Sequence, residues 1–162
     1  MGSGKTTYGK LMAKKLKMDF FDLDDYIEAK YCKTITELFE EWGEEKFRIV
    51  EKECLHEIPL SGNCLIATGG GTPCFFDNME FMNHHGDTIY LRTSVRELRD
   101  RLKLSVIKRP LLLGKSLMEL EAHITQMLKS RESFYLKSRY ILDTDDLNPN
   151  NILSSYMELK ET

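Results

Sequence analysis

The first ten residues constrain the fold most, because they hold the second half of a phosphate-binding loop. The run Gly2-Ser3-Gly4-Lys5-Thr6-Thr7 matches the end of the pattern GxxxxGK[ST], in which small residues let successive backbone N–H groups point at a polyphosphate. An amphipathic helix is predicted over 5–16, so its positive N-terminal end would face the same anion. The alternative is a chance GSGK sequence in an ordinary turn.

The beginning of this pattern is missing. Its first glycine would lie two residues before Met1, and a strand normally precedes such a loop. We therefore expect either that about ten N-terminal residues of the natural domain are missing or that Met1 is an internal methionine of a longer product.

Short apolar runs alternate with amphipathic segments along the rest of the chain. Runs of strand length lie at 18–22, 64–68, 88–91 and 139–143, and helices are predicted from Asp24 onward, from Thr34 onward, over 44–58, over 95–104 and after Pro149. Thr34 and Glu37 have the spacing of a capping box, and the helix over 44–58 is predicted to face inward with Phe47, Val50, Cys54 and Leu55. The predicted fold is therefore α/β with a mainly parallel sheet.

Composition excludes several classes of protein. The 162 residues suit one domain, and 41% hydrophobic residues can form a core. No apolar stretch reaches the roughly 18 residues of a membrane span, and no leader is recognised, so we expect a soluble cytoplasmic protein. A formal charge of −3 argues against nucleic acid as the partner. The four cysteines form no CxxC pair and predict neither a zinc site nor a redox motif.

Two aspartates stand at the end of the first predicted strand. Asp22 and Asp24 flank Leu23, and alternate residues of an extended segment point the same way. Such a pair could serve Mg²⁺ through water and a hydroxyl nucleophile through a direct hydrogen bond. The alternative is a helix N-cap at Asp24 beside a solvated neighbour.

Glycines and single arginines provide further candidate binding groups. Gly69-Gly70-Gly71 follows a buried strand, at the edge where parallel α/β sheets bind ligands, although a tight turn is the alternative. Arg48, Arg109 and Arg131 each offer a planar fork for a carboxylate or phosphate. Arg48 could instead pair with Glu51, and all three could be surface residues.

The segment at about 105–117 has no clear periodicity and contains a proline and a glycine. A loop of this length in a compact domain is typical of a lid or a binding loop. The alternative is a short surface helix with one apolar side.

Six motifs, GSGKTT, FDLDD, EEKFRIVE, TGGG, KRPLL and SRESFY, occur in the order in which they occur in shikimate kinases, and the chain resembles that family. The resemblance implies a three-layer P-loop kinase fold, with a parallel sheet flanked by helices. It implies a single domain over 1–162, with a lid at about 105–117 and substrate-binding helices at about 24–58. The missing first strand would lie mid-sheet, so we expect this chain to be less stable or less active than the full domain.

The resemblance also implies an activity and its cofactors. Shikimate kinases use ATP to phosphorylate the 3-hydroxyl of shikimate in the pathway to chorismate and the aromatic amino acids. ATP would be bound by Gly2, Ser3, Gly4, Lys5, Thr6 and Thr7. Mg²⁺ would be bound by Thr6 and, through water, by Asp22.

The remaining site residues follow from the same motifs. Asp24 would bind the substrate hydroxyls and accept a proton, Arg48 and Arg131 would hold the shikimate carboxylate, and Gly70 would donate from its backbone. The lid residue Arg109 would reach the reacting phosphate, so the resemblance implies Lys5, Asp24 and Arg109 as catalytic residues.

We expect a monomer that binds neither nucleic acid nor a membrane. Adenine contacts are not assigned, although Arg101 is a candidate. Two other functions stay open: a P-loop kinase for another acceptor, such as gluconate or a nucleoside monophosphate, and a catalytically silent nucleotide-binding module.

Overall fold

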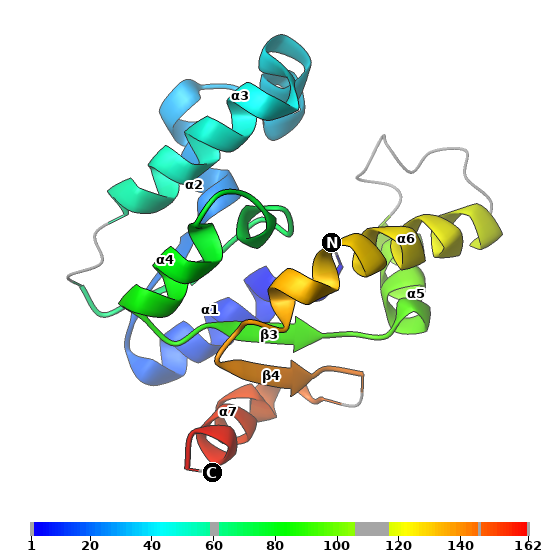
Figure 1. The fold of residues 1–162 in the computed structure, drawn as a ribbon. Helices are drawn as coiled ribbons and strands as arrows, with labels where there is room; N and C mark the ends of the chain where they lie inside the picture. The colour runs from blue at the N-terminus through cyan, green and yellow to red at the C-terminus, as the bar shows by residue number, and fades with distance from the viewer. Residues whose placement is uncertain (1, 59–61, 106–116, 146, 162) are drawn as a thin grey trace.

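The computed structural model describes residues 2–58, 62–105, 117–145 and 147–161. The four described strands are β1 (Asp19–Asp22), β2 (Cys64–Ala67), β3 (Ile89–Arg92) and β4 (Tyr140–Asp143). The described helices are α1 (Lys5–Leu16), α2 (Leu23–Tyr31), α3 (Ile35–Glu57), α4 (Asn78–His85), α5 (Val95–Ser105), α6 (Leu117–Tyr135) and α7 (Ile152–Glu161). Short 3₁₀ turns cover Thr72–Cys74 and Pro149–Asn151. The predicted α/β fold is confirmed (Figure 1).

The described strands form two parallel pairs. β1 pairs with β2 in the register Asp19 to Cys64, and β3 pairs with β4 in the register Ile89 to Tyr140. A cavity of about 660 Å³ is lined by both β2 and β3 and therefore separates the two pairs. The predicted parallel pairing is confirmed.

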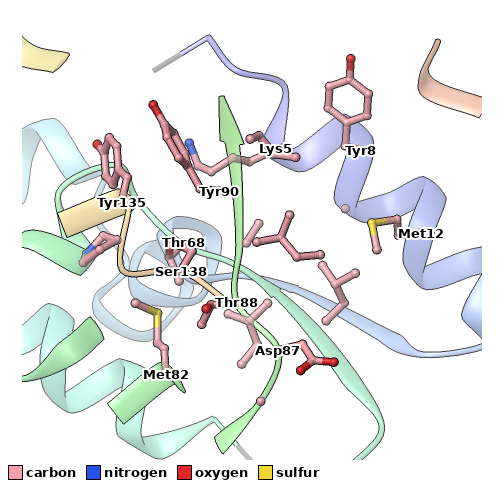
Figure 2. A pocket seen from close by; sticks show the side chains of 18 of the residues that line it. Lys5, Tyr8, Met12, Thr68, Met82, Asp87, Thr88, Tyr90, Tyr135 and Ser138 are labelled. Carbon is pink, nitrogen blue, oxygen red and sulfur yellow. The ribbon is translucent and has the colours of Figure 1, made fainter. Parts of the chain in front are cut away.

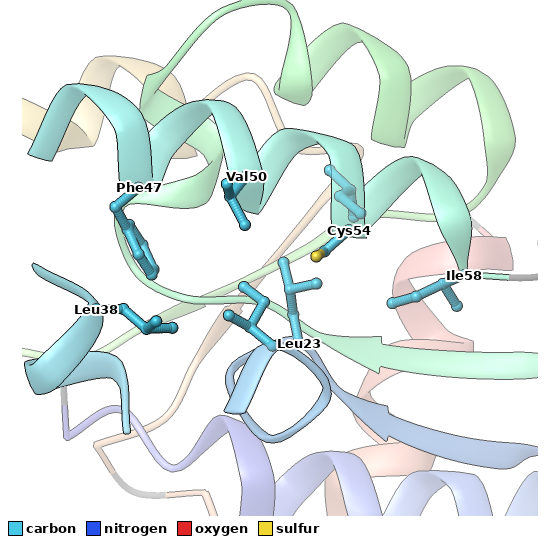
Figure 3. Close-up of a cluster of buried hydrophobic side chains, with 8 residues drawn as sticks. Leu23, Leu38, Phe47, Val50, Cys54 and Ile58 are labelled. Atoms are coloured by element: carbon cyan, nitrogen blue, oxygen red, sulfur yellow. The ribbon is translucent and has the colours of Figure 1, made fainter. Parts of the chain in front are cut away.

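The largest buried cluster joins α2 and α3 (Figure 3). Its members are Leu23, Ile27, Leu38, Phe47, Val50, Cys54, Leu55 and Ile58. The apolar positions of 44–58 that were predicted to face inward are among them, because they recur at the three- and four-residue spacing of one helix face. This cluster attaches α3 to the N-terminal half of α2, where the predicted site residue Asp24 lies.

The start and the bend of α3 follow from two local features. Thr34 and Glu37 form the predicted capping box, in which the Thr34 backbone N–H donates to Glu37 Oε2 at 2.7 Å and the Glu37 backbone N–H donates to Thr34 Oγ1 at 3.3 Å. Gly43 has φ 71° and ψ 171°, which interrupts the helix. The prediction of a separate helix from about residue 44 therefore corresponds to the segment of α3 after this bend.

Two smaller clusters complete the core. One joins α1, β4 and α7 through Tyr8, Met12, Leu142, Ile152 and Tyr156, and the other joins α5 to α6 through Leu98, Leu102, Leu120 and Ile124. Within the described ranges, no helix has both the length and the apolar character that a membrane crossing requires.

Candidate active site

The phosphate loop has the backbone conformation that its glycines predict. Gly2 and Gly4 have φ values of 80° and 86°, a region that residues with a Cβ rarely adopt. A Cβ atom at Gly4 would also lie 2.9 Å from the Tyr8 ring. Gly4 is the N-cap of α1 and has no side chain that could cap this helix end.

Arg101, on α5, forms hydrogen bonds with the main chain of this loop. Its guanidinium donates to the Ser3 carbonyl at 3.3 Å and to the Thr144 carbonyl at 3.1 Å. Its Nε donates to Glu97 at 2.8 Å. The candidate adenine contact therefore holds the main chain of the loop against the end of β4.

The two residues predicted to bind Mg²⁺ lie together. Thr6 Oγ1 donates to Asp22 Oδ2 at 2.8 Å, which brings two oxygen ligands of the kind Mg²⁺ prefers to the start of α1. Among the described residues, no group of three or more His, Cys, Asp or Glu side chains is arranged to hold a metal. The hydroxyl and the carboxylate are donors of the kind that Mg²⁺ uses together with phosphate and water ligands.

The prediction that Asp24 is an N-cap, or lies in an extended segment beside Asp22, is wrong. Asp22 itself caps α2, because its backbone is extended and its Oδ1 accepts the Asp24 N–H at 3.2 Å. Asp24 therefore lies in the first helical turn. β1 ends at Asp22, where the predicted run 18–22 also ends, and Asp22 rather than Asp24 is the N-cap of the following helix.

Asp24 nevertheless faces the glycine segment 69–71. A Cβ atom at Gly69 would lie 3.1 Å from both Asp24 Oδ1 and Glu51 Oε1, so a side chain at this position would crowd the two carboxylates. Burial raises the pKa of Asp24, and the nearby charges of Asp22 and Glu51 raise it further, while Lys5 lowers it. Asp24 therefore lies within electrostatic reach of the phosphate-loop lysine.

Arg48 is buried and paired. Its Nη1 donates to Glu51 Oε2 at 2.8 Å and its Nη2 donates to Glu44 Oε1 at 3.0 Å, while only 7% of the residue is exposed. Its guanidinium also lies 4.4 Å from the centre of the Phe75 ring. The alternative of pairing with Glu51 is thus correct, but the pair is buried rather than solvated.

The same arginine contacts the glycine segment. A Cβ atom at Gly71 would lie 2.6 Å from Arg48 Nη1, so this glycine allows the guanidinium to pack on the backbone. The second oxygen of the Glu51 carboxylate accepts the Thr72 hydroxyl at 2.7 Å. Glu51 was not among the predicted site residues, although its spacing of three from Arg48 indicated the contact.

Arg131 approaches the site from α6. Burial raises the pKa of the Cys74 thiol, and the charges of both Arg131 and Arg48 act against this rise. Both arginines therefore lie near the turn that follows the glycine segment. Tyr135, one helical turn after Arg131, donates its hydroxyl to the Gly70 carbonyl at 2.5 Å.

Lys5 and Gly70 line the cavity between the strand pairs. In Figure 2, Lys5, Tyr90 and Tyr135 lie near the carboxyl end of β3, and Met82 and Asp87 lie toward its other end. The structure therefore brings together Lys5, Thr6, Asp22, Asp24, Arg48, Gly70 and Arg131. The predicted lid at about 105–117 falls largely on residues 106–116, and these, with Arg109, lie outside the described residues.

A phosphate loop, an acid within its electrostatic reach and two arginines beside a glycine segment define a kinase of the P-loop class. Comparisons with known proteins identify its family. The family model described as shikimate kinase matches residues 1–160, and the chain belongs to the shikimate kinase family.

Individual relatives agree with this assignment. A shikimate kinase from Parabacteroides distasonis is 50% identical over 147 residues, which is 91% of this chain and 85% of that protein. The crystal structure of shikimate kinase from Bacteroides thetaiotaomicron has a TM-score of 0.94 and 44% identity, over 100% of this chain and 94% of that one. A structure from Acinetobacter baumannii, in complex with shikimate, has a TM-score of 0.87 and 32% identity, over 99% of this chain and 88% of that one. The predicted P-loop kinase fold is confirmed.

Proposed function

We propose that this chain transfers the γ-phosphoryl group of ATP to the 3-hydroxyl of shikimate and forms shikimate 3-phosphate. The observation that carries the proposal is the convergence of Asp24 and Arg48 on the glycine segment 69–71, beside the phosphate loop. Membership of the shikimate kinase family and the relative solved with shikimate support this acceptor.

The phosphate loop would bind the nucleotide. Backbone N–H groups of residues 2–7 and the Lys5 ammonium would hold the β- and γ-phosphates, because the transition state spreads negative charge over the transferred oxygens. Thr6 and, through water, Asp22 would hold Mg²⁺, which neutralises phosphate charge when it is bound. Arg109 would add a further positive charge at the reacting phosphate.

The acceptor would be held at its acidic end. Arg48 and Arg131 would bind the shikimate carboxylate through charge-assisted hydrogen bonds, and the Gly70 backbone would donate to the substrate. The 3-hydroxyl would then lie beside Asp24, which would accept its proton during attack on phosphorus. The raised pKa of Asp24 favours this role, since a base is most effective when its pKa approaches the working pH.

A coupled ATP assay with several acceptors tests the proposal. Shikimate should give ADP formation, whereas gluconate and a nucleoside monophosphate should leave the rate at background. If gluconate or the nucleoside monophosphate gave a higher rate than shikimate, that acceptor would be the substrate and the proposal would be wrong. ATP binding without transfer to any acceptor would favour the silent nucleotide-binding module.

The proposal includes a single domain over residues 1–162 with a lid at about 105–117, a monomeric state and a cytoplasmic location. Sedimentation of the purified chain with and without ATP tests the oligomeric state, and a stable dimer would contradict it.

A further inference from the structure

The three carbonyl groups of the glycine segment 69–71 accept hydrogen bonds from different donors. The Gly69 carbonyl accepts the Thr72 N–H at 3.2 Å and the Gly71 carbonyl accepts the Cys74 N–H at 2.8 Å, so both belong to the local turn. The Gly70 carbonyl also has a weak local donor, the Cys74 thiol at 3.9 Å, but its short hydrogen bond is with the Tyr135 hydroxyl, at 2.5 Å and across 65 positions of sequence. The middle glycine is thus bonded to a side chain of a distant helix.

The surroundings of Tyr135 favour a neutral phenol that donates its proton. Its ring lies 5.1 Å from the Tyr90 ring, and both residues line the cavity between the strand pairs. Burial raises the pKa of Tyr135, while the charge of Arg131 opposes this rise. The hydroxyl therefore stays protonated at neutral pH, and a partly buried hydrogen bond of this kind costs free energy to break.

This bond has a mechanical consequence. Consecutive glycines have the largest backbone freedom of any residues, so a glycine segment keeps one conformation only when other contacts restrain it. Arg131 and Tyr135 lie one turn apart on the same helix and therefore share one face. The hydrogen bond from Tyr135 to Gly70 thus links the position of Arg131 to the backbone conformation of residues 69–71.

We propose that Tyr135 is a positioning residue that holds the Gly70 backbone and Arg131 in the relative positions that bind the acceptor. This inference rests on the proposed function, in which Gly70 and Arg131 bind shikimate, but the tether itself is independent of the substrate. Tyr135 would touch neither phosphate nor acceptor. Its loss would weaken binding of the acceptor and leave binding of ATP unchanged.

Tyr135→Phe tests the proposal, because it removes only the hydroxyl. A matched control is Tyr156→Phe, which removes an equally short phenol hydrogen bond, to Asp87 at 2.6 Å, on α7. Tyr135→Phe should raise the KM for shikimate by about two- to tenfold, the value of one hydrogen bond, without changing the KM for ATP. Tyr156→Phe should change neither KM.

Hydrogen exchange of the ligand-free chain separates this inference from the proposed function. The amides of residues 69–71 should exchange faster in Tyr135→Phe than in the wild type, and Tyr156→Phe should leave them unchanged. Unchanged exchange in Tyr135→Phe, or an equal rise of both KM values, would overturn the positioning role. If the amides of residues 69–71 exchange more slowly in the wild type than in Tyr135→Phe, but the wild type transfers no phosphate to shikimate, the positioning role stands and the proposed function is wrong.

Discussion

Arg48 is held by Glu51 through a buried ion pair of 2.8 Å, and the second oxygen of the same carboxylate accepts the Thr72 hydroxyl at 2.7 Å. The carboxylate therefore fixes the arginine to the turn after the glycine segment. A buried pair of this kind is strongly destabilised when one partner is removed, because the other charge stays buried without compensation.

Glu51→Gln should lower the free energy of unfolding by about 3 kcal/mol, since it keeps the shape of the side chain but removes its charge. It should also raise the KM for shikimate, because Arg48 loses the group that orients it. Urea unfolding and steady-state kinetics measure the two effects. Glu57→Gln is the control, since the solvent-exposed Glu57–Lys30 pair should contribute much less to stability. Equal losses of stability in both variants would contradict the role of burial.

Asp24→Asn should separate stability from activity. The folded-state pKa of Asp24 is raised, so the folded chain binds this proton more tightly than the unfolded chain does. The wild type should therefore lose stability as the pH rises from the unfolded value of 3.8 through the folded value, and Asp24→Asn should remove this loss.

At neutral pH the Asn variant should thus be more stable than the wild type, while kcat should fall by about a hundredfold or more if Asp24 accepts the proton. Thermal unfolding at several pH values and kcat measurements check both parts. An Asn variant that is less stable than the wild type would show that the surroundings stabilise the ionised Asp24 carboxylate, which would contradict the raised pKa.

Asp22→Asn should affect the metal dependence more than the fold. Asparagine caps a helix about as well as aspartate, so α2 should remain intact, whereas the negative charge near Thr6 is lost. The Mg²⁺ concentration for half-maximal rate should rise, with the KM for shikimate unchanged. Asp25→Asn, at a neighbouring position of the same helix turn, is the matched control. An unaltered Mg²⁺ requirement in Asp22→Asn would exclude Asp22 from the metal site.

Two arginines should give opposite kinetic signatures. Arg48→Ala should raise the KM for shikimate by about tenfold or more, because each charge-assisted bond contributes roughly 1.5–3 kcal/mol. Arg109→Ala should lower kcat more than substrate affinity, because its charge would act on the reacting phosphate. Equal changes of kcat and KM in both variants would contradict these separate roles.

Thr34→Ala should destabilise the chain by about 1 kcal/mol without changing either KM, because it removes the capping box at the start of α3 and touches no site residue. Chemical denaturation measures the loss. A kinetic effect would mean that the start of α3 is coupled to the site.

Much of the fold could be predicted because its determinants are local. The capping box at Thr34, the inward-facing positions of 44–58 and the strand ahead of Gly69 follow from periodicity and turn chemistry. The N-cap of α2 was placed wrongly at Asp24, because Asp22 and Asp24 are both good N-cap residues and only the hydrogen-bond geometry decides between them. No helix was predicted over 117–135, and α6 is found there.

The missed site residues depend on long-range contacts. Tyr135 meets Gly70 across 65 positions, and no pattern within the sequence of one chain reports such a contact. Glu51 meets Arg48 on the same helix, so its contact was visible, but its burial and its bond to Thr72 arise only from packing against the glycine segment. The resemblance singled out Arg48 as a candidate for substrate binding, and the structure adds the Glu51 carboxylate that pairs with it.

The most direct test of the central claim is the position of the phosphate in the product. Phosphorus–proton correlation spectra of the reaction of this chain with ATP, Mg²⁺ and shikimate should show one phosphate monoester, coupled to the proton on carbon 3 of shikimate. Coupling to a different ring proton, or no ester at all with shikimate at millimolar concentration, would contradict the account.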